Sequence, residues 1–182
     1  MAERRLRYTI ADRITEADTS KIIKRALTGD ASAARTDNRV IWDDGGDQVL
    51  LHVDTVVVKL VKRFVFVSAD FETDQTGRGP LIVALAFGST EDGAGLVATT
   101  DEQPHGHPVI AARWGRIFQQ VVWTALLSAA RAHATERGKA PQTLHVLNGA
   151  LRFGAAAPVD LRASALESFD KAFPGARARM RK

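Results

Sequence analysis

The stretch TVVVKLVKRFVFVSADF, residues 55–71, decides the fold of this chain of 182 residues. It is dense in valine and phenylalanine, which favour strands, and it predicts two strands over 55–61 and 64–71. Side chains alternate between the two faces of a strand. In the second strand this places Phe64 and Phe66 on one face, and Val65, Val67, Ala69 and Phe71 on the other.

Further strands are predicted on both sides of this stretch. They cover residues 39–42, 48–53, 81–87, 96–99, 143–147 and 151–153. The run Asp43 to Asp47 contains Asp-Gly and Gly-Gly, which supply the positive φ that a tight hairpin needs. Residues 81–87 are apolar throughout, so we expect a central strand that is buried on both faces.

A long helix is predicted over residues 110–137, and Gly138 with Pro141 ends it. Its apolar residues cover more than one face, so we expect the sheet and a second element, the terminal helix or another subunit, to cover it. Shorter helices are predicted over 20–28, capped by Asp18 and Thr19, and over 161–173. The fold class is therefore α+β: an antiparallel or mixed sheet of about five to seven strands packed against a long central helix, with shorter N- and C-terminal helices.

Composition predicts a globular chain, because 45% of the residues are hydrophobic and 25% are charged. We expect an N-terminal helical appendage and linker (1–38), an α+β domain (39–175) and a basic C-terminal tail (176–182). The absence of cysteine excludes disulfides, a thiol nucleophile and cysteine-ligated zinc. No apolar run is long enough to span a membrane, and the first residues do not resemble a signal peptide, so a cytoplasmic protein is expected.

The positive charge lies at the two ends of the sequence. The net charge is +4 for the whole chain, but it is +2 for residues 1–30, −2 for 31–160 and +4 for 161–182. The basic residues that we expect to make contacts are Arg4, Arg5, Arg7, Arg177, Arg179, Arg181 and Lys182. Such flexible cationic ends attract phosphates or acidic surfaces.

These features lead to the first hypothesis, a non-enzymatic binding or assembly protein whose basic ends contact nucleic acid or an acidic protein partner. It has no catalytic residue and no cofactor. Self-association through the apolar helix 110–137 is expected, and a structural homo-oligomer subunit with inert ends is an alternative.

Asp70, Glu72 and Asp74 alternate at the end of the strand 64–71, and carboxylates on one face hold Mg²⁺ or Mn²⁺ in phosphoryl-transfer enzymes. The run Asp70-Phe71-Glu72-Thr73 resembles the first motif of the DnaQ-type exonucleases, and the order strand, strand, helix, strand is similar to the ribonuclease H-like fold. The resemblance implies a metal-dependent nuclease, which is the second alternative. The counterpart of the family's next acidic motif, residues 148–152, has Arg152 where a metal ligand belongs.

The histidines give weaker predictions. His105-Gly106-His107-Pro108 resembles the metal motif of JAMM-type proteases, but residues 111–122 lack the serine and aspartate of that family, so incidental histidines are expected. His52 and Asp54 are expected to face solvent on one strand face. His145 lies in an apolar strand and is expected to be a hydrogen-bonded core histidine.

Overall fold

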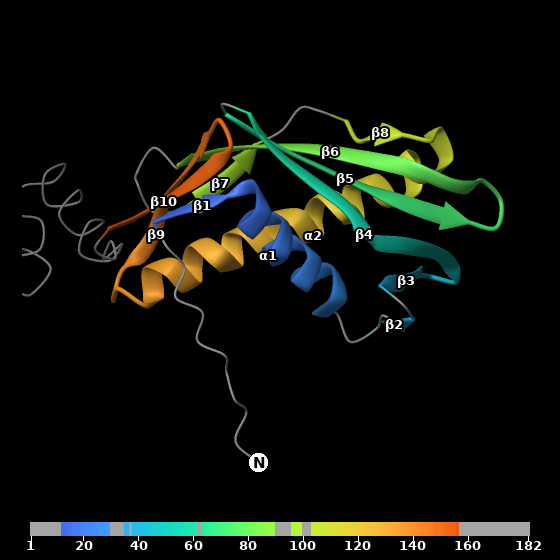
Figure 1. Cartoon of the computed structure of the whole chain (residues 1–182), viewed down its shortest axis with the longest axis horizontal. Helices are drawn as coiled ribbons and strands as arrows, with labels where there is room; N and C mark the ends of the chain where they lie inside the picture. Colours follow the sequence, from blue (N-terminus) through green and yellow to red (C-terminus); the bar gives the residue numbers. More distant parts are fainter. Residues whose placement is uncertain are drawn as a thin grey trace, which may run out of the picture.

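The computed structural model of the chain describes residues 12–29, 35–36, 38–61, 63–89, 96–99 and 103–156 (Figure 1). Within these ranges, the elements in chain order are β1 Arg13–Thr15, α1 Glu16–Gly29, β2 Arg35–Thr36, β3 Arg39–Asp44, β4 Asp47–Val61, β5 Phe64–Thr73, β6 Gly77–Ser89, β7 Leu96–Thr99, β8 His105–Gly106, α2 Pro108–Thr135, β9 Ala140–Leu147 and β10 Ala150–Ala156. Every strand predicted from the sequence lies within one of these strands, and the two predicted over 48–53 and 55–61 form the single strand β4.

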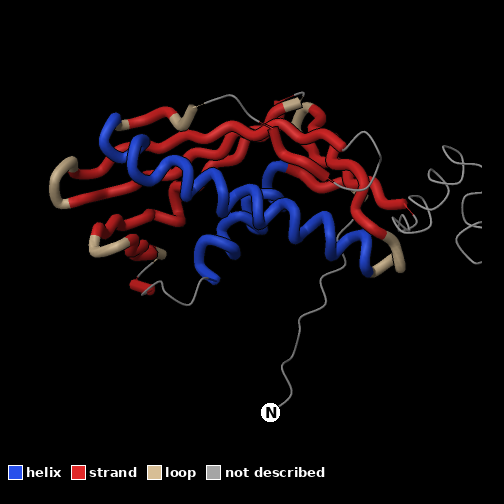
Figure 2. Tube along the Cα trace, turned by 180° about the vertical axis from the view of Figure 1, so that it is seen from behind, coloured by secondary structure: helices blue, strands red, loops and turns tan. Residues whose placement is uncertain are grey.

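The strands form two antiparallel sheets. The larger has the order β2-β3-β4-β5-β6-β7, with β8 paired to β6, and the smaller has the order β1-β10-β9. Both helices lie on one side of the larger sheet (Figure 2). The α+β class and the antiparallel pairing are thus confirmed. The predicted helix over 161–173 lies outside the described residues. The strand that follows α2 joins the smaller sheet, so the topology adds nothing to the ribonuclease H-like resemblance.

Helix α2 begins two residues before the prediction and ends two residues earlier. Pro108 occupies the first turn, where its missing N–H costs nothing, and Gly138 adopts φ +62° just after the helix ends. The helix contacts α1, β6, β9 and β10. These elements of the same chain bury its apolar residues, and Val109 is the one exposed large hydrophobic residue of α2. Self-association through residues 110–137 was predicted because the apolar helix needs a cover, and elements of the same chain supply that cover. Self-association itself stays an untested prediction.

Four aromatic side chains join α2 to the larger sheet. The ring centroids of Phe71 and Phe118 are 5.1 Å apart in an edge-to-face arrangement, and Phe118 is fully buried. Trp42 lies 5.6 Å from Phe71 and 6.5 Å from Trp114 by ring centroids. Edge-to-face pairs at these distances add to the stabilisation from burial alone. This cluster, Trp42, Phe71, Trp114 and Phe118, fixes the helix on the inner face of β3 and β5.

A β-bulge between His52 and Val57 interrupts the pairing of β4 with β5. Before the bulge the inward residues are odd-numbered, with Val49 and Leu51 buried, and after it they are even-numbered, as in Val58. Residues 53–56 of β4 lie opposite the single residue Ala69 of β5, and this excess of three residues changes which side chains face the helices. It explains why residue 54 separates two apparent strands in the sequence.

The N-terminal segment is built into this core. The hydroxyl of Thr15 accepts a hydrogen bond from the backbone N–H of Asp18 at 3.2 Å and donates one to its carboxylate at 2.9 Å. This reciprocal cap starts α1 four residues before the predicted helix 20–28, and the predicted caps Asp18 and Thr19 lie inside it. Ile23 of α1 is fully buried. Within the segment predicted as an appendage, residues 13–29 thus add a strand and a helix to the common core.

Among the described strands, none pairs with the second half of β4 on the side away from β5, because β3 pairs with it only as far as His52. Other groups satisfy this edge. The Glu16 carboxylate accepts the Leu60 N–H at 2.7 Å, and the Leu60 carbonyl accepts the N–H of Gly149 at 2.8 Å. The Lys24 ammonium donates to the Asp54 carbonyl at 3.3 Å. Covering an edge in this way prevents pairing with other strands.

Replacement of Phe118 by alanine is expected to lower the free energy of unfolding by about 3–5 kcal/mol, because it removes the centre of the aromatic cluster and leaves a cavity. Urea denaturation followed by circular dichroism measures this change. The matched control is Gln120→Ala, two residues away on the exposed side of α2, which is expected to change stability by less than about 0.5 kcal/mol. Equal losses in the two variants would contradict the proposed role of the cluster.

Candidate binding surface on the outer face of the sheet

Half of the side chains of β4, β5 and β6 point away from the helices. We call this surface the outer face. Cross-strand pairs fix its members, because paired residues of antiparallel strands share a face. They are His52, Val57, Lys59, Val61, Phe64, Phe66, Ser68, Asp70, Glu72, Arg78, Pro80, Ile82, Ala84 and Ala86. The prediction for Phe64 and Phe66 is confirmed, since the residues that alternate with them are the buried ones.

The end of the outer face near the β5–β6 turn is polar. His52 Nε2 lies 2.8 Å from a carboxylate oxygen of Glu72. Arg78 Nε donates to Asp70 Oδ2 at 2.9 Å, and Arg78 Nη2 lies 2.9 Å from the same oxygen. His52 is only 6% exposed, so the expectation that it faces solvent beside Asp54 is wrong for His52. The bulge tucks the imidazole against β5. The carboxylates of Asp70 and Glu72 therefore each have a partner within the polar end.

The predicted metal ligands separate at this end. Asp70 and Glu72 share the outer face as expected, but Asp74 lies in the turn that follows β5 and is exposed. Within the described ranges, no group of three or more histidine, aspartate or glutamate side chains is placed to hold a metal ion. An arginine and a histidine contact Asp70 and Glu72 instead. The metal-dependent nuclease stays an untested alternative.

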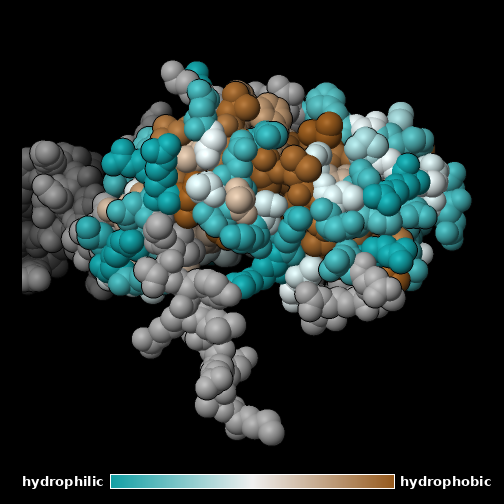
Figure 3. Space-filling view, in the orientation of Figure 1, coloured by the Kyte–Doolittle hydropathy of each residue, from teal (hydrophilic) through white to brown (hydrophobic). Residues whose placement is uncertain are grey.

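The other end of the outer face is apolar. Val57 is 50% exposed, Val61 51% and Ile82 38%, although all three are aliphatic residues of strands, Val61 being the last residue of β4. The rings of Phe64 and Phe66 lie between them, with centroids 5.9 Å apart. Hydrophobic side chains gather over β4 to β6 in the space-filling view (Figure 3). The exposure of Ile82 also corrects the prediction that the strand 81–87 is buried on both faces.

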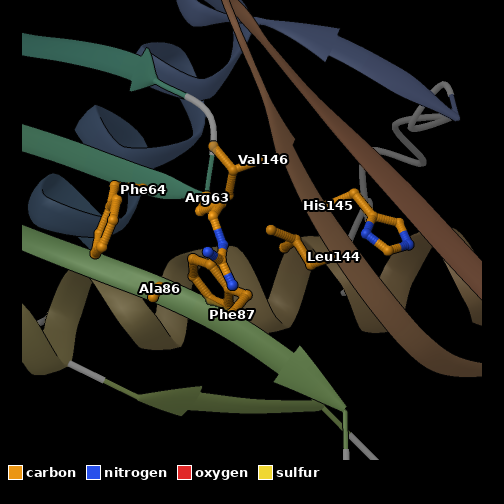
Figure 4. Close-up of a pocket in the computed structure, with 7 residues that line it drawn as sticks. All are labelled: Arg63, Phe64, Ala86, Phe87, Leu144, His145 and Val146. Carbon is orange, nitrogen blue, oxygen red and sulfur yellow. The ribbon is translucent and has the colours of Figure 1, made fainter.

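A hollow of about 510 Å³ lies where this apolar end meets the smaller sheet. Its lining comes from the β4–β5 turn, β5, β6 and β9: Arg63, Phe64, Ala86, Phe87, Leu144, His145 and Val146. Arg63 extends into the gap between β6 and β9 (Figure 4). The predicted core histidine, His145, is exposed, while Leu144 and Val146 on either side of it are buried. Sequence reasoning missed both the hollow and Arg63.

The other predicted site residues are dispersed. The basic residues of the two ends, from Arg4 to Arg7 and from Arg177 to Lys182, lie outside the described residues. His105 belongs to β8 and His107 precedes α2, and both are exposed. Gly106 between them has φ +151°, and a Cβ there would lie 2.2 Å from the Pro80 carbonyl oxygen. The motif is therefore explained by the close pairing of β8 with β6.

A second histidine pair ties the start of the described chain to the end of α2. His133 Nε2 lies 2.8 Å from Asp12 Oδ1, and Arg137 Nη2 lies 3.0 Å from the same oxygen. His133 is buried and stacks on Phe153. The hydrogen bond from His133, followed by the charge of Arg137, holds the pKa of the Asp12 carboxyl below its ordinary value. This cluster anchors β1 to α2.

Comparison with protein-family models, with curated proteins and with solved structures finds no match, so functional argument rests on the geometry of the chain itself. Among the described helices, none has the length and apolar character needed to cross a membrane.

The Asp12 pair predicts a pH dependence of stability. Because the pKa of Asp12 is lower in the folded than in the unfolded state, its stabilising effect is complete above the unfolded value of about 3.9 and is lost as pH falls through the folded value. The stability difference between the wild type and Asp12→Asn is therefore expected to be constant between about pH 5 and 6 and to shrink below about pH 4.

Urea denaturation at each pH checks this prediction. The matched control is Asp54→Asn, which also removes one exposed carboxylate, but one outside the cluster. A wild-type and Asp12→Asn pair whose difference stays constant down to low pH would show that the cluster does not hold the carboxylate in its charged form.

Proposed function

We propose that this chain is a non-enzymatic binding or assembly protein that docks an acidic protein partner on the apolar end of its outer face. The observation that carries the proposal is the exposure of Val57 and Val61 on β4 and of Ile82 on β6, on the same face of the sheet and on either side of β5. Single exposed apolar residues are ordinary, but a contiguous apolar area on a folded domain usually marks an interaction surface.

The chemistry of this surface favours a protein partner over nucleic acid. Aliphatic side chains contribute little to binding phosphates, whereas they pack well against apolar side chains. Arg63 stands at its edge as a basic group, and Lys59 lies within the apolar end, where its ammonium is 3.7 Å from the Glu16 carboxylate. An acidic partner complements Arg63. We propose that the basic ends of the sequence, Arg4 to Arg7 and Arg177 to Lys182, make further contacts with the same acidic partner. We also propose that the protein acts in the cytoplasm.

Replacement of Val57 by aspartate tests the docking surface. The probe is a fluorescein-labelled octapeptide in which leucine alternates with glutamate, and the measurement is fluorescence anisotropy. The variant is expected to weaken binding by at least about tenfold, or about 1.4 kcal/mol, because a charge replaces an apolar contact. An octapeptide with lysine in place of glutamate is expected to bind the wild type at least about tenfold more weakly.

The matched control is Val109→Asp, because Val109 is 51% exposed, as Val57 is 50% exposed, but lies on α2. Equal losses in the two variants, or equal binding of both peptides, would refute the proposal. Sedimentation velocity separates the homo-oligomer alternative. A wild-type dimer that Val57→Asp dissociates would mean that the outer face binds a second copy instead.

A further inference from the structure

The hollow at the edge of the outer face holds an arginine without a partner. Three other arginines of the chain pair with carboxylates: Arg78 with Asp70, Arg113 with Asp44 and Asp47, and Arg137 with Asp12. In the part of the chain that the structure describes, the guanidinium of Arg63 makes no hydrogen bond or ion pair. Its position in a lined hollow distinguishes it from arginines on an open convex surface.

The backbone of Arg63 is held in an unfavourable conformation. Its φ is +81°, a region that side chains other than glycine, asparagine and aspartate rarely adopt, at a cost of about 1–2 kcal/mol. Its N–H donates to the Val146 carbonyl at 3.2 Å, so the turn is fixed to β9 of the smaller sheet. A two-residue connection between the paired residues Val61 and Phe64 requires positive φ, so the turn itself sets the position from which the Arg63 side chain extends.

The walls of the hollow indicate what the guanidinium meets. Phe64 and Phe87 come from the larger sheet, and Leu144 and Val146 come from the smaller one (Figure 4). A guanidinium offers two parallel N–H groups that match the two oxygens of a carboxylate. His145 also lines the hollow, but its ring points away from Arg63 (Figure 4), so the guanidinium is not joined by the further donors that a phosphate dianion would need. The shape and chemistry fit a carboxylate attached to an apolar or aromatic group.

We propose that this hollow is a carboxylate-binding site, in which Arg63 pairs with a carboxylate of the partner while Phe64, Phe87 and Leu144 contact the adjoining apolar group. The assignment of this carboxylate to a protein partner rests on the proposed function. The site then fixes the orientation of the bound partner. The partner's apolar segment lies over Val57 and Val61, and its acidic group enters the hollow.

Two small molecules of the same shape test the site without the partner. Phenylacetate carries the carboxylate and the ring, and phenylacetamide carries the ring without the charge. Titration into the isotope-labelled full chain, followed by NMR, is expected to shift the amide signals of Arg63, Phe64, Phe87 and Leu144 with a dissociation constant on the order of millimolar for phenylacetate. Phenylacetamide is expected to bind at least about tenfold more weakly, and inorganic phosphate likewise.

Arg63→Asn removes the guanidinium without disturbing the turn, because asparagine tolerates positive φ. This variant is expected to be at least as stable as the wild type in urea and to lose the phenylacetate shifts. Arg63→Lys keeps the charge but not the paired N–H groups, so its affinity for phenylacetate is expected to lie between those of the wild type and Arg63→Asn. Retention of wild-type phenylacetate binding by Arg63→Asn would overturn the site, as would equal binding of phenylacetamide.

Val57→Asp separates this inference from the proposed function. It lies outside the hollow, so phenylacetate binding is expected to survive while binding of the leucine–glutamate octapeptide is lost. If phenylacetate binds through Arg63 but no octapeptide binds the wild type, the site stands and the docking function fails. If the octapeptide binds and Arg63→Asn leaves its affinity unchanged, docking stands and the assignment of the partner's carboxylate to the hollow is overturned.

Discussion

The hydroxyl of Thr55 holds the bulge on which the two faces of the sheet depend. It donates to the His52 carbonyl at 2.7 Å and accepts the Asp70 N–H at 2.8 Å, so it bridges β4 and β5 where their direct pairing is interrupted. If the alternation of residues 49–51 continued through β4 without this irregularity, Lys59 would face the core and Leu60 would face solvent. Burial of an unpaired ammonium costs several kcal/mol, so the bulge is required for the apolar half of β4 to pack at all.

The same bulge gives the outer face two ends with different chemistry. On one side of it, His52 and Glu72, and Asp70 and Arg78, form pairs that leave little polar capacity for a ligand. On the other side, the aliphatic side chains around Val57 have no cover from the described residues. Burial of apolar area is the main favourable term in association, whereas exposed ion pairs contribute little. The proposed docking therefore takes most of its binding energy from the apolar end.

Periodicity predicted much of this fold, but not its irregularities. Alternation correctly placed Phe64 and Phe66 on the face of β5 that lies away from its buried residues, and Gly138 correctly indicated the end of α2. The bulge was not predictable, because it depends on a hydroxyl that meets a strand fifteen residues away. The burial of His52 follows from that bulge, and the site at Arg63 depends on a contact with β9, which is distant in sequence. Patterns within one strand carry no information about such contacts between strands.

The charge distribution decides what kind of electrostatic contribution the outer face makes. Residues 31–160, which hold the outer face and the hollow, carry a net charge of −2, so the body as a whole does not attract an acidic partner from a distance. A local cation acts differently, because an ion pair formed in a partly desolvated hollow is strong only at short range. Aliphatic contacts around Val57 are non-directional, whereas a guanidinium paired with a carboxylate fixes orientation. In the proposed docking, Arg63 thus contributes specificity and the apolar contacts contribute affinity.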